Sequence, residues 1–226
     1  MQDNYIVIGT KSWNRNVFED ARLGKHWHFF EHLVQGILEE LQPACIFFLH
    51  WSDKVPSSVL ELYNCVGFHM TNVPFGRGGT PLQNLINAGY DSTKLTAFRM
   101  VEEMDAGPIY LQYDLSLEGL AEEIYIRATW LSLRMAQQIA SKQIEPVSQR
   151  GAGTTFRRRT PDQSELSGLG SLQGLFDHIR MLDAENYPRA FLQYAGFRYE
   201  FSRPALRCGR IEADVTIRPI KEKEST

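Results

Sequence analysis

The feature that most restricts the fold of this 226-residue chain is its alternation of short apolar runs with helical patterns. Tyr5–Gly9, Ala44–His50 and Cys65–His69 are apolar runs of the length typical of buried strands. Leu33–Pro43 and Thr80–Gly89 space their apolar residues as helices do, and they end at a proline and at a glycine. This alternation predicts an α/β fold, Rossmann-like, in which a mostly parallel sheet carries helices on both faces.

The rest of the chain predicts two further strands, one long helix and a small β-rich C-terminal segment. Lys94–Val101 and Gly107–Leu117 alternate as strands do, and residues 117–142 repeat apolar side chains every three or four positions. Residues 149–171 are rich in Gly, Ser, Thr and charge, which indicates a boundary or a crossing loop. We therefore predict one main domain over residues 1–148, and a helix with two or three antiparallel strands over residues 149–226.

Composition narrows the environment in which this chain works. No apolar run approaches the roughly 20 residues of a membrane helix, and the first residues lack the pattern of a signal peptide. The three cysteines lie far apart in the sequence, which argues against a disulfide framework. We therefore expect a cytoplasmic protein without a membrane partner.

Charge argues against a nucleic-acid partner. The formal net charge is -3; residues 1–150 carry 12 Lys and Arg against 17 Asp and Glu, and residues 151–226 carry 12 against 10. Nucleic-acid-binding domains usually have a basic excess or a basic face. Arg157, Arg158 and Arg159 form the one basic cluster, which we interpret as solvated loop charge or as an anion contact.

Two polar residues stand where strands end. His69 ends an apolar run and is followed by a loop with Gly76, Gly78 and Gly79, whose small size lets a ligand approach the backbone. Asp105 precedes Ala-Gly-Pro in a turn between two predicted strands. Each has a purely structural alternative, a backbone-satisfied histidine and a turn-capping aspartate. If the two loops meet at one sheet edge, a carboxylate beside an imidazole makes a general acid/base pair.

These two segments resemble the 10-formyltetrahydrofolate-dependent formyltransferase family, over roughly residues 1–145. The family pattern is Asn-x-His, then Ser or Thr, Leu-Pro, Arg-Gly and Pro, with a later Asp-x-Gly. The positions that match it are His69, Thr71, Pro74, Arg77, Gly78, Pro81, Asp105 and Gly107. Gly67 departs from it, because the family's asparagine, which binds the formyl oxygen, falls there.

The resemblance implies direct transfer of a formyl group to an amine, without a metal. His69 is then the general base, Asp105 orients it, and Asn72, Thr71 or a backbone N–H replaces the missing amide as the oxyanion donor. It also implies that the loop 49–56 lines the folate pocket, with Trp51, Lys54 and Val55 facing the pterin and residues 100–104, ending at Met104, opposite.

The acceptor is less defined, and several alternatives stay open. The C-terminal segment resembles that of the sugar N-formyltransferases, so we expect a nucleotide-linked amino sugar. Contacts to it are expected from Lys11, Trp13, Asn14 and Arg77. The alternatives are a methionyl-tRNA or glycinamide ribonucleotide formyltransferase, a non-catalytic folate-binding member, and a non-folate acyltransferase. We also expect a homodimer that forms through the β-rich segment. We expect His26, His28 and His32 to be surface histidines and not the ligands of a metal site.

Overall fold

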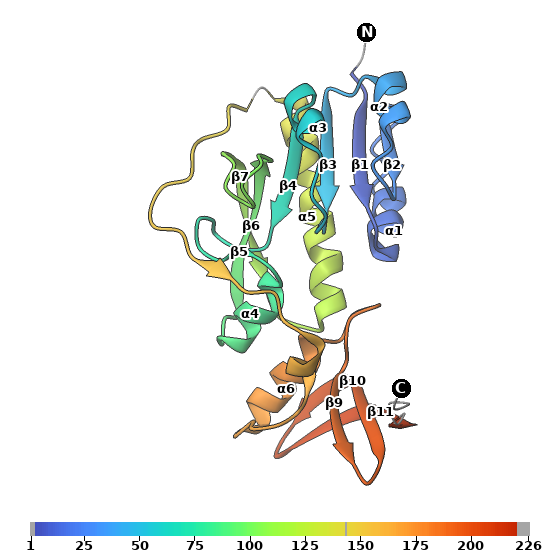
Figure 1. Cartoon of the computed structure of the whole chain (residues 1–226), viewed down its shortest axis with the longest axis vertical. Helices are drawn as coiled ribbons and strands as arrows, with labels where there is room; N and C mark the ends of the chain where they lie inside the picture. Colours follow the sequence, from blue (N-terminus) through green and yellow to red (C-terminus); the bar gives the residue numbers. More distant parts are fainter. Residues whose placement is uncertain (1–2, 143, 221–226) are drawn as a thin grey trace, which may run out of the picture. The chain divides into compact units, whose positions relative to one another are not determined.

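The computed structural model describes residues 3–142 and 144–220 (Figure 1). The chain divides into two compact units, which are described separately. Unit 1 comprises residues 1–81, 92–116 and 125–157, and unit 2 comprises residues 82–91, 117–124 and 158–226. The sequence predicted a single change of domain at residue 149. The segment 149–157 instead belongs to unit 1, because β8 (Thr155–Phe156) pairs with β5 (Arg77–Gly78).

The core of unit 1 is a six-stranded sheet in the order β2-β1-β3-β4-β6-β7, which confirms the predicted α/β class. Its strands are β1 (Tyr5–Gly9), β2 (Trp27–Phe30), β3 (Cys45–Leu49), β4 (Cys65–His69), β6 (Ser92–Arg99) and β7 (Ile109–Ser116). The first four strands are parallel, whereas β6 and β7 are antiparallel to their neighbours. All five residues of β3 are buried, as expected for a central strand covered on both faces.

The helices follow the predicted alternation with shorter bounds. They are α1 (Ser12–Ala21), α2 (Gln35–Leu41), α3 (Ser57–Leu62), α4 (Pro81–Asn87) and α5 (Ala121–Ser141). Pro56 stands just before α3, where a missing N–H costs nothing. Helix α5 buries Ile124, Ala128 and Met135, which are separated by four and seven residues and so form one stripe along its length.

The sequence analysis missed, among other elements, α1 and β2. It expected Trp13 and Asn14 to contact the acceptor, but α1 begins at Ser12 and buries Trp13, Asn14 and Val17. It expected His28 to be a surface histidine, but His28 lies in β2, paired with Ile6 of β1. All four residues of this short edge strand are half-buried, so its positions do not alternate between buried and exposed.

Unit 2 contains α6 (Leu172–Arg180) and an antiparallel sheet of β9 (Ala190–Tyr194), β10 (Phe197–Arg207) and β11 (Arg210–Pro219). The predicted turns at Gly196 and Gly209 join these strands, and both glycines have positive φ. The Arg180 guanidinium donates to the carbonyls of Leu117 and Gly119, which ties those residues to α6. In the described parts of the chain, no helix has the length and apolar character needed to cross a membrane.

Candidate active site

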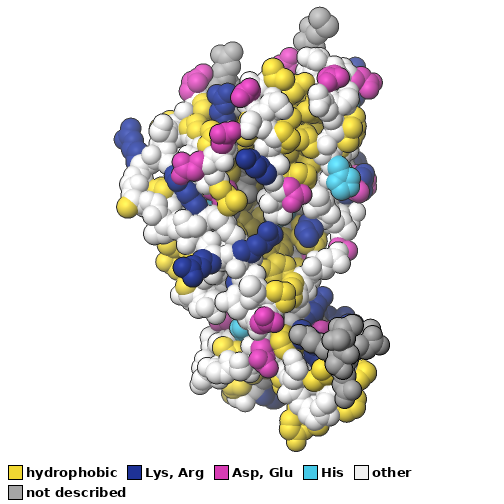
Figure 2. All heavy atoms as spheres, viewed as in Figure 1, with side chains coloured by type: hydrophobic (Ala, Val, Ile, Leu, Met, Phe, Trp, Pro, Cys, Tyr) yellow, Lys and Arg dark blue, Asp and Glu magenta, His cyan; other side chains and the backbone are white. Residues whose placement is uncertain are grey.

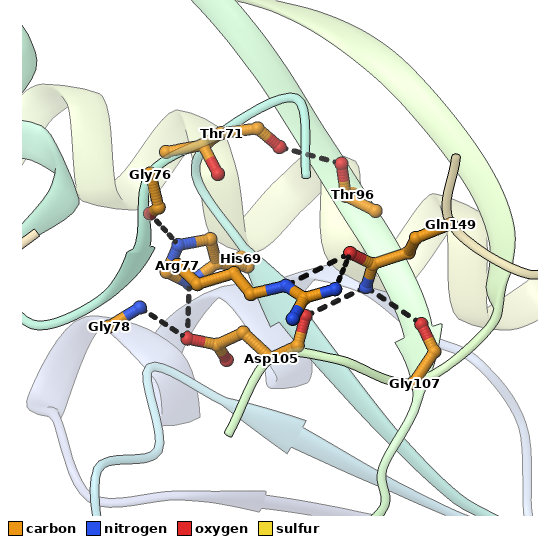
Figure 3. A network of polar contacts seen from close by, with 9 residues as sticks. All are labelled: His69, Thr71, Gly76, Arg77, Gly78, Thr96, Asp105, Gly107 and Gln149. Atoms are coloured by element: carbon orange, nitrogen blue, oxygen red, sulfur yellow. Dashed lines mark hydrogen bonds and ion pairs between the residues drawn. The ribbon is translucent and has the colours of Figure 1, made fainter. Parts of the chain in front are cut away.

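His69 lies at the carboxyl end of β4, where the chain leaves the sheet (Figure 3). Its side chain is only 8% exposed, and both ring nitrogens face oxygen atoms. Nε2 lies 2.8 Å from the carbonyl oxygen of Gly76, and Nδ1 lies 3.5 Å from Oδ2 of Asp105. The ring can therefore donate to the loop with Nε2 while Nδ1 exchanges a proton beside the carboxylate.

Asp105 lies in the turn between β6 and β7 and reaches back to the loop after β4. Oδ2 accepts a 2.8 Å hydrogen bond from the backbone N–H of Gly78, which fixes the carboxylate beside His69. Asp105 has a φ of +54°, a conformation in which aspartate is enriched among non-glycine residues. Gly107 is required by close packing, because a Cβ there would lie 1.6 Å from the carbonyl oxygen of Arg99. The structure thus brings together the two residues that the sequence predicted as a pair.

Arg77 and Gln149 complete the polar network (Figure 3). Oε1 of Gln149 accepts from Nε and Nη2 of Arg77 at 3.1 and 2.8 Å. Nε2 of Gln149 donates to the carbonyls of Asp105 and Gly107 at 2.7 and 2.8 Å. Arg77 also pairs with Glu103 at 3.0 Å, so its guanidinium is bound within unit 1.

The side chains of Phe98 and Met100 fill the space beside Gly67, the position where the family has its asparagine. A Cβ on Gly67 would lie 2.9 Å from Cζ of Phe98 and 3.2 Å from Cγ of Met100. Gly67 and Phe98 are direct partners across β4 and β6, so their side chains share one face of the sheet. Phe98 therefore occupies the position that an amide at residue 67 would need.

Thr71 and Asn72 differ in their surroundings. The Thr71 side chain is fully buried and its Oγ1 has no hydrogen-bond partner, while its carbonyl accepts from Thr96 at 2.7 Å. Asn72 is exposed, and its Oδ1 accepts from Nε2 of Gln112 at 2.8 Å. Of these two residues, Thr71 is the one with a buried side-chain group that has no hydrogen-bond partner.

The residues expected to line a folate pocket fall into two groups. Val55 is buried in an apolar cluster, against which Trp51 and Met100 pack. A shallow pocket opens beside Met100 and is also lined by Leu60, Arg99, Val101 and Pro108. Lys54 and Met104 are exposed, and Met104 is 69% accessible.

Three of the residues expected to contact the acceptor, Lys11, Trp13 and Asn14, follow the carboxyl end of β1, close to the end of β3. Trp13 and Asn14 are buried: Trp13 stacks on Tyr125 at 5.7 Å, and Asn14 Nδ2 lies 3.0 Å from Nδ1 of His50. Burial, together with a smaller effect of nearby Lys11, lowers the pKa of His50 to about 4. His50 is thus neutral near pH 7. Lys11 is half-buried and is the member of this group with side-chain surface that a ligand can reach.

Sequence reasoning did not find Gln149, His50 or Phe98. The sequence predicted a boundary or a crossing loop at Gln149. In the structure, Gln149 lies two residues after Val147, which pairs with Ile109 of β7. No sequence pattern marks a single glutamine that bonds to distant carbonyls. Over residues 3–142 and 144–220, no group of three His, Cys, Asp or Glu side chains is arranged to hold a metal ion.

Comparisons with known proteins bear on the family and the fold of this chain. A profile described as the methionyl-tRNA formyltransferase C-terminal domain matches residues 161–218. The methionyl-tRNA formyltransferase of Bacillus mycoides (strain KBAB4) is 27% identical over 165 residues, covering 69% of this chain and 52% of that protein. This chain thus spans about half the length of the curated relatives it matches.

Solved structures give a closer match. A methionyl-tRNA formyltransferase from Clostridium thermocellum has a TM-score of 0.90 and 40% identity, covering 96% of this chain and 99% of that one. HypX from Aquifex aeolicus, in complex with tetrahydrofolic acid, shares the fold with a TM-score of 0.74 at 14% identity, covering 90% of this chain and 38% of its own. A sugar N-formyltransferase from Shewanella shares it at 13% identity. The chain belongs to the formyltransferase family.

Proposed function

We infer that this protein is an N-formyltransferase that moves a formyl group from 10-formyltetrahydrofolate to an amine. The observation that carries the inference is the His69–Asp105 pair, buried at a strand end and held by backbone groups. Membership of the formyltransferase family supplies the reaction class, and the HypX complex supports a folate donor.

His69 takes the proton of the attacking amine in this proposal. Nε2 is engaged with the Gly76 carbonyl, so Nδ1, beside Asp105, is the nitrogen that can exchange a proton. The Asp105 carboxylate stabilises the imidazolium that forms, which is the usual role of an acid beside a catalytic histidine. The amine nitrogen bonds to the formyl carbon of the folate donor, and the bond between that carbon and the folate nitrogen breaks. The proton held by His69 passes to the folate nitrogen, so that tetrahydrofolate leaves and the acceptor keeps the formyl group as a formamide.

The formyl oxygen needs a donor other than residue 67. We assign this role first to the Thr71 hydroxyl, because it is buried without a partner. The Asn72 amide remains the second candidate: its Oδ1 accepts from Gln112, and its Nδ2 would be the donor to the formyl oxygen. Loss of one such donor typically costs about 3 kcal/mol of barrier, so Thr71→Val and Asn72→Ala should differ clearly in kcat.

The folate residues proposed here are Trp51, Val55 and Met100, which share an apolar cluster; of the three, Met100 also lines the open pocket. In this proposal a flat pterin ring packs against these apolar side chains, and its polar edge faces the backbone of residues 54 and 55. Met104 and Lys54 are kept as contacts at the rim, because both are exposed.

A nucleotide-linked amino sugar is the acceptor that we favour. In the described part of unit 2, the arginines of the β-hairpin are paired with acids: Arg198 with Glu200, Arg203 with Asp214, and Arg210 with Glu212. On the face in Figure 2, basic and acidic side chains are interspersed. A large tRNA would be expected to need an unbalanced positive surface. Lys11 and Arg77 are the proposed contacts to the acceptor, with Trp13 and Asn14 holding the first loop.

Methionyl-tRNA is the second candidate acceptor. It is favoured by the names of the 40% identical structure and of the profile that matches residues 161–218. The two acceptors differ so much in size and charge that one experiment separates them.

The test is a product assay with 10-formyltetrahydrofolate and a panel of acceptors. The panel contains nucleotide-linked 3-amino and 4-amino sugars, glycinamide ribonucleotide and methionyl-tRNA, and each product is weighed by mass spectrometry. A gain of one formyl group on a sugar supports the proposal, and formylation of methionyl-tRNA alone would replace the acceptor. Folate binding without turnover on any amine would instead indicate a non-catalytic member.

A further inference from the structure

The segment after α5 contacts the loop after β4, which contains Gly76, the residue whose carbonyl binds His69. Residues 147–156, here called the crossover segment, bond to that loop through backbone and side chain alike. Thr154 Oγ1 accepts from Gly76 N–H at 2.8 Å, and its carbonyl accepts from Arg77 N–H at 3.0 Å. Gly76 is the residue whose carbonyl binds His69, so the crossover segment holds one side of the histidine.

The same segment holds the other side through Gln149. The amide has donors on one end and an acceptor on the other, and all of these are engaged by two different loops. The donors bind the Asp105 and Gly107 carbonyls, and the acceptor binds Arg77. One half-buried side chain therefore locks the aspartate turn to the loop after β4.

Asp105 is a residue whose position needs such a lock. Its backbone has a φ of +54°, a conformation that persists where surrounding contacts determine it. Its Oδ2 lies 3.5 Å from Nδ1 of His69, longer than a normal hydrogen bond, so a small movement of the turn decides whether the pair functions.

We propose that Gln149 is a positioning residue that sets the geometry of the His69–Asp105 pair, and that the crossover segment is part of the active site. The proposal rests on the formyl-transfer function proposed above. Gln149 acts through the Asp105 turn, because its side chain bonds to the carbonyls of Asp105 and Gly107. Its side chain is specific for this role, because glutamate would face two carbonyl oxygens with a carboxylate and methionine would make no hydrogen bond.

The experiment compares Gln149→Met and Gln149→Glu with the matched control Gln137→Met, an exposed glutamine on α5. We expect both Gln149 variants to lower kcat by about 10- to 100-fold, since misplacement by about 1 Å has effects of this size. The affinity for tetrahydrofolate and the thermal midpoint should stay near the wild-type values. Gln149→Glu keeps an oxygen for Arg77, so its loss of kcat isolates the bonds to the Asp105 turn.

A double-mutant cycle with Asp105→Asn supplies the decisive kinetic test. If Gln149 acts through the Asp105 turn, then Gln149→Glu, which keeps an oxygen for Arg77, has almost no further effect on kcat in the Asp105→Asn background. Multiplied effects would overturn the proposal, as would a wild-type kcat in Gln149→Glu. A merely structural role would lower both backgrounds alike and would also lower the thermal midpoint.

A readout without turnover separates this proposal from the proposed function. The amide of Gly78 bonds to Asp105 Oδ2, and the amide of Ala106 bonds to the Glu103 carbonyl. Hydrogen exchange at these two amides should be at least about tenfold faster in Gln149→Met than in Gln137→Met. Equal exchange would overturn the positioning role even if no acceptor is ever formylated. If the wild type formylates no acceptor and exchange is still faster in Gln149→Met than in Gln137→Met, the positioning role stands and the failure lies in the proposed reaction.

Discussion

Two strands of the same sheet, β4 and β3, each carry a histidine at the carboxyl end, and the surroundings of these two histidines differ. His69, at the end of β4, faces a carbonyl and a carboxylate that belong to two loops. His50, just after β3, lies among Trp13, Asn14 and Tyr125 and is held neutral by burial. Both positions are at carboxyl ends of parallel strands, where ligands usually bind in α/β folds. The strand end therefore supplies a place for chemistry, and the neighbouring acceptors decide whether a histidine can exchange protons there.

Of the changes to the surroundings of the two histidines, removal of the Asp105 carboxylate should lower kcat the most. Asp105→Asn leaves a side chain of the same size but cannot stabilise an imidazolium, so we expect kcat to fall by about 100- to 1000-fold. The KM for the folate donor should change little, because asparagine has the size of aspartate and leaves the neighbouring folate contact Met104 in place. Steady-state assays of tetrahydrofolate release measure both values, and a kcat within twofold of wild type would contradict the assignment.

Restoring the family asparagine should harm the protein. Gly67→Asn introduces a Cβ 2.9 Å from the Phe98 ring, so we expect a loss of roughly 1–3 kcal/mol in the free energy of unfolding. Phe98→Leu shortens the opposing side chain, so the penalty of Gly67→Asn should be smaller in that background. Urea unfolding of the four proteins in this cycle gives the coupling. Equal penalties in both backgrounds would show that Phe98 does not fill the site.

His50 should affect the pH dependence of the protein's stability and not its turnover. Its pKa is about 4 in the folded chain against 6.5 ordinarily, so only the unfolded chain takes up a proton between these values. Stability is then full above pH 6.5 and is lost as the pH falls toward 4, by about 2 kcal/mol for this partly exposed ring. His50→Gln should remove that slope, as measured by unfolding from pH 7 to pH 4.5. An unchanged slope would assign the acid sensitivity to other groups.

These contrasts also explain what the sequence could predict. His69 and Asp105 were found because each ends or joins a strand with a readable pattern, and strand ends of one sheet meet at one edge. Gln149 was missed because its role depends on hydrogen bonds to residues more than 40 positions away, which no local pattern encodes. Trp13 and Asn14 were assigned to a substrate loop, yet they lie in α1 and are buried. A polar residue in a short stretch gives no sign of whether it faces a ligand or the core.

Unit 2 was predictable in outline for the same reason. Its strands are joined by turns at Gly196 and Gly209, which interrupt alternating patterns that can be read locally. Its membership was not predictable, because residues 82–91 and 117–124 join it through contacts such as that of Gln83 with the Met181 carbonyl. Contacts of this kind appear only in the folded chain.

The measurement that tests the central claim most directly is a single-turnover reaction of His69→Ala beside the wild type. Both would be mixed with formyl-labelled 10-formyltetrahydrofolate and the acceptor identified in the panel, and the labelled formamide would be followed over time. The account predicts rapid transfer by the wild type and a rate at least about 1000-fold lower for His69→Ala, with folate still bound. Transfer by His69→Ala at a rate near that of the wild type would contradict the account, because the amine would then lose its proton without the residue that this site is built to hold.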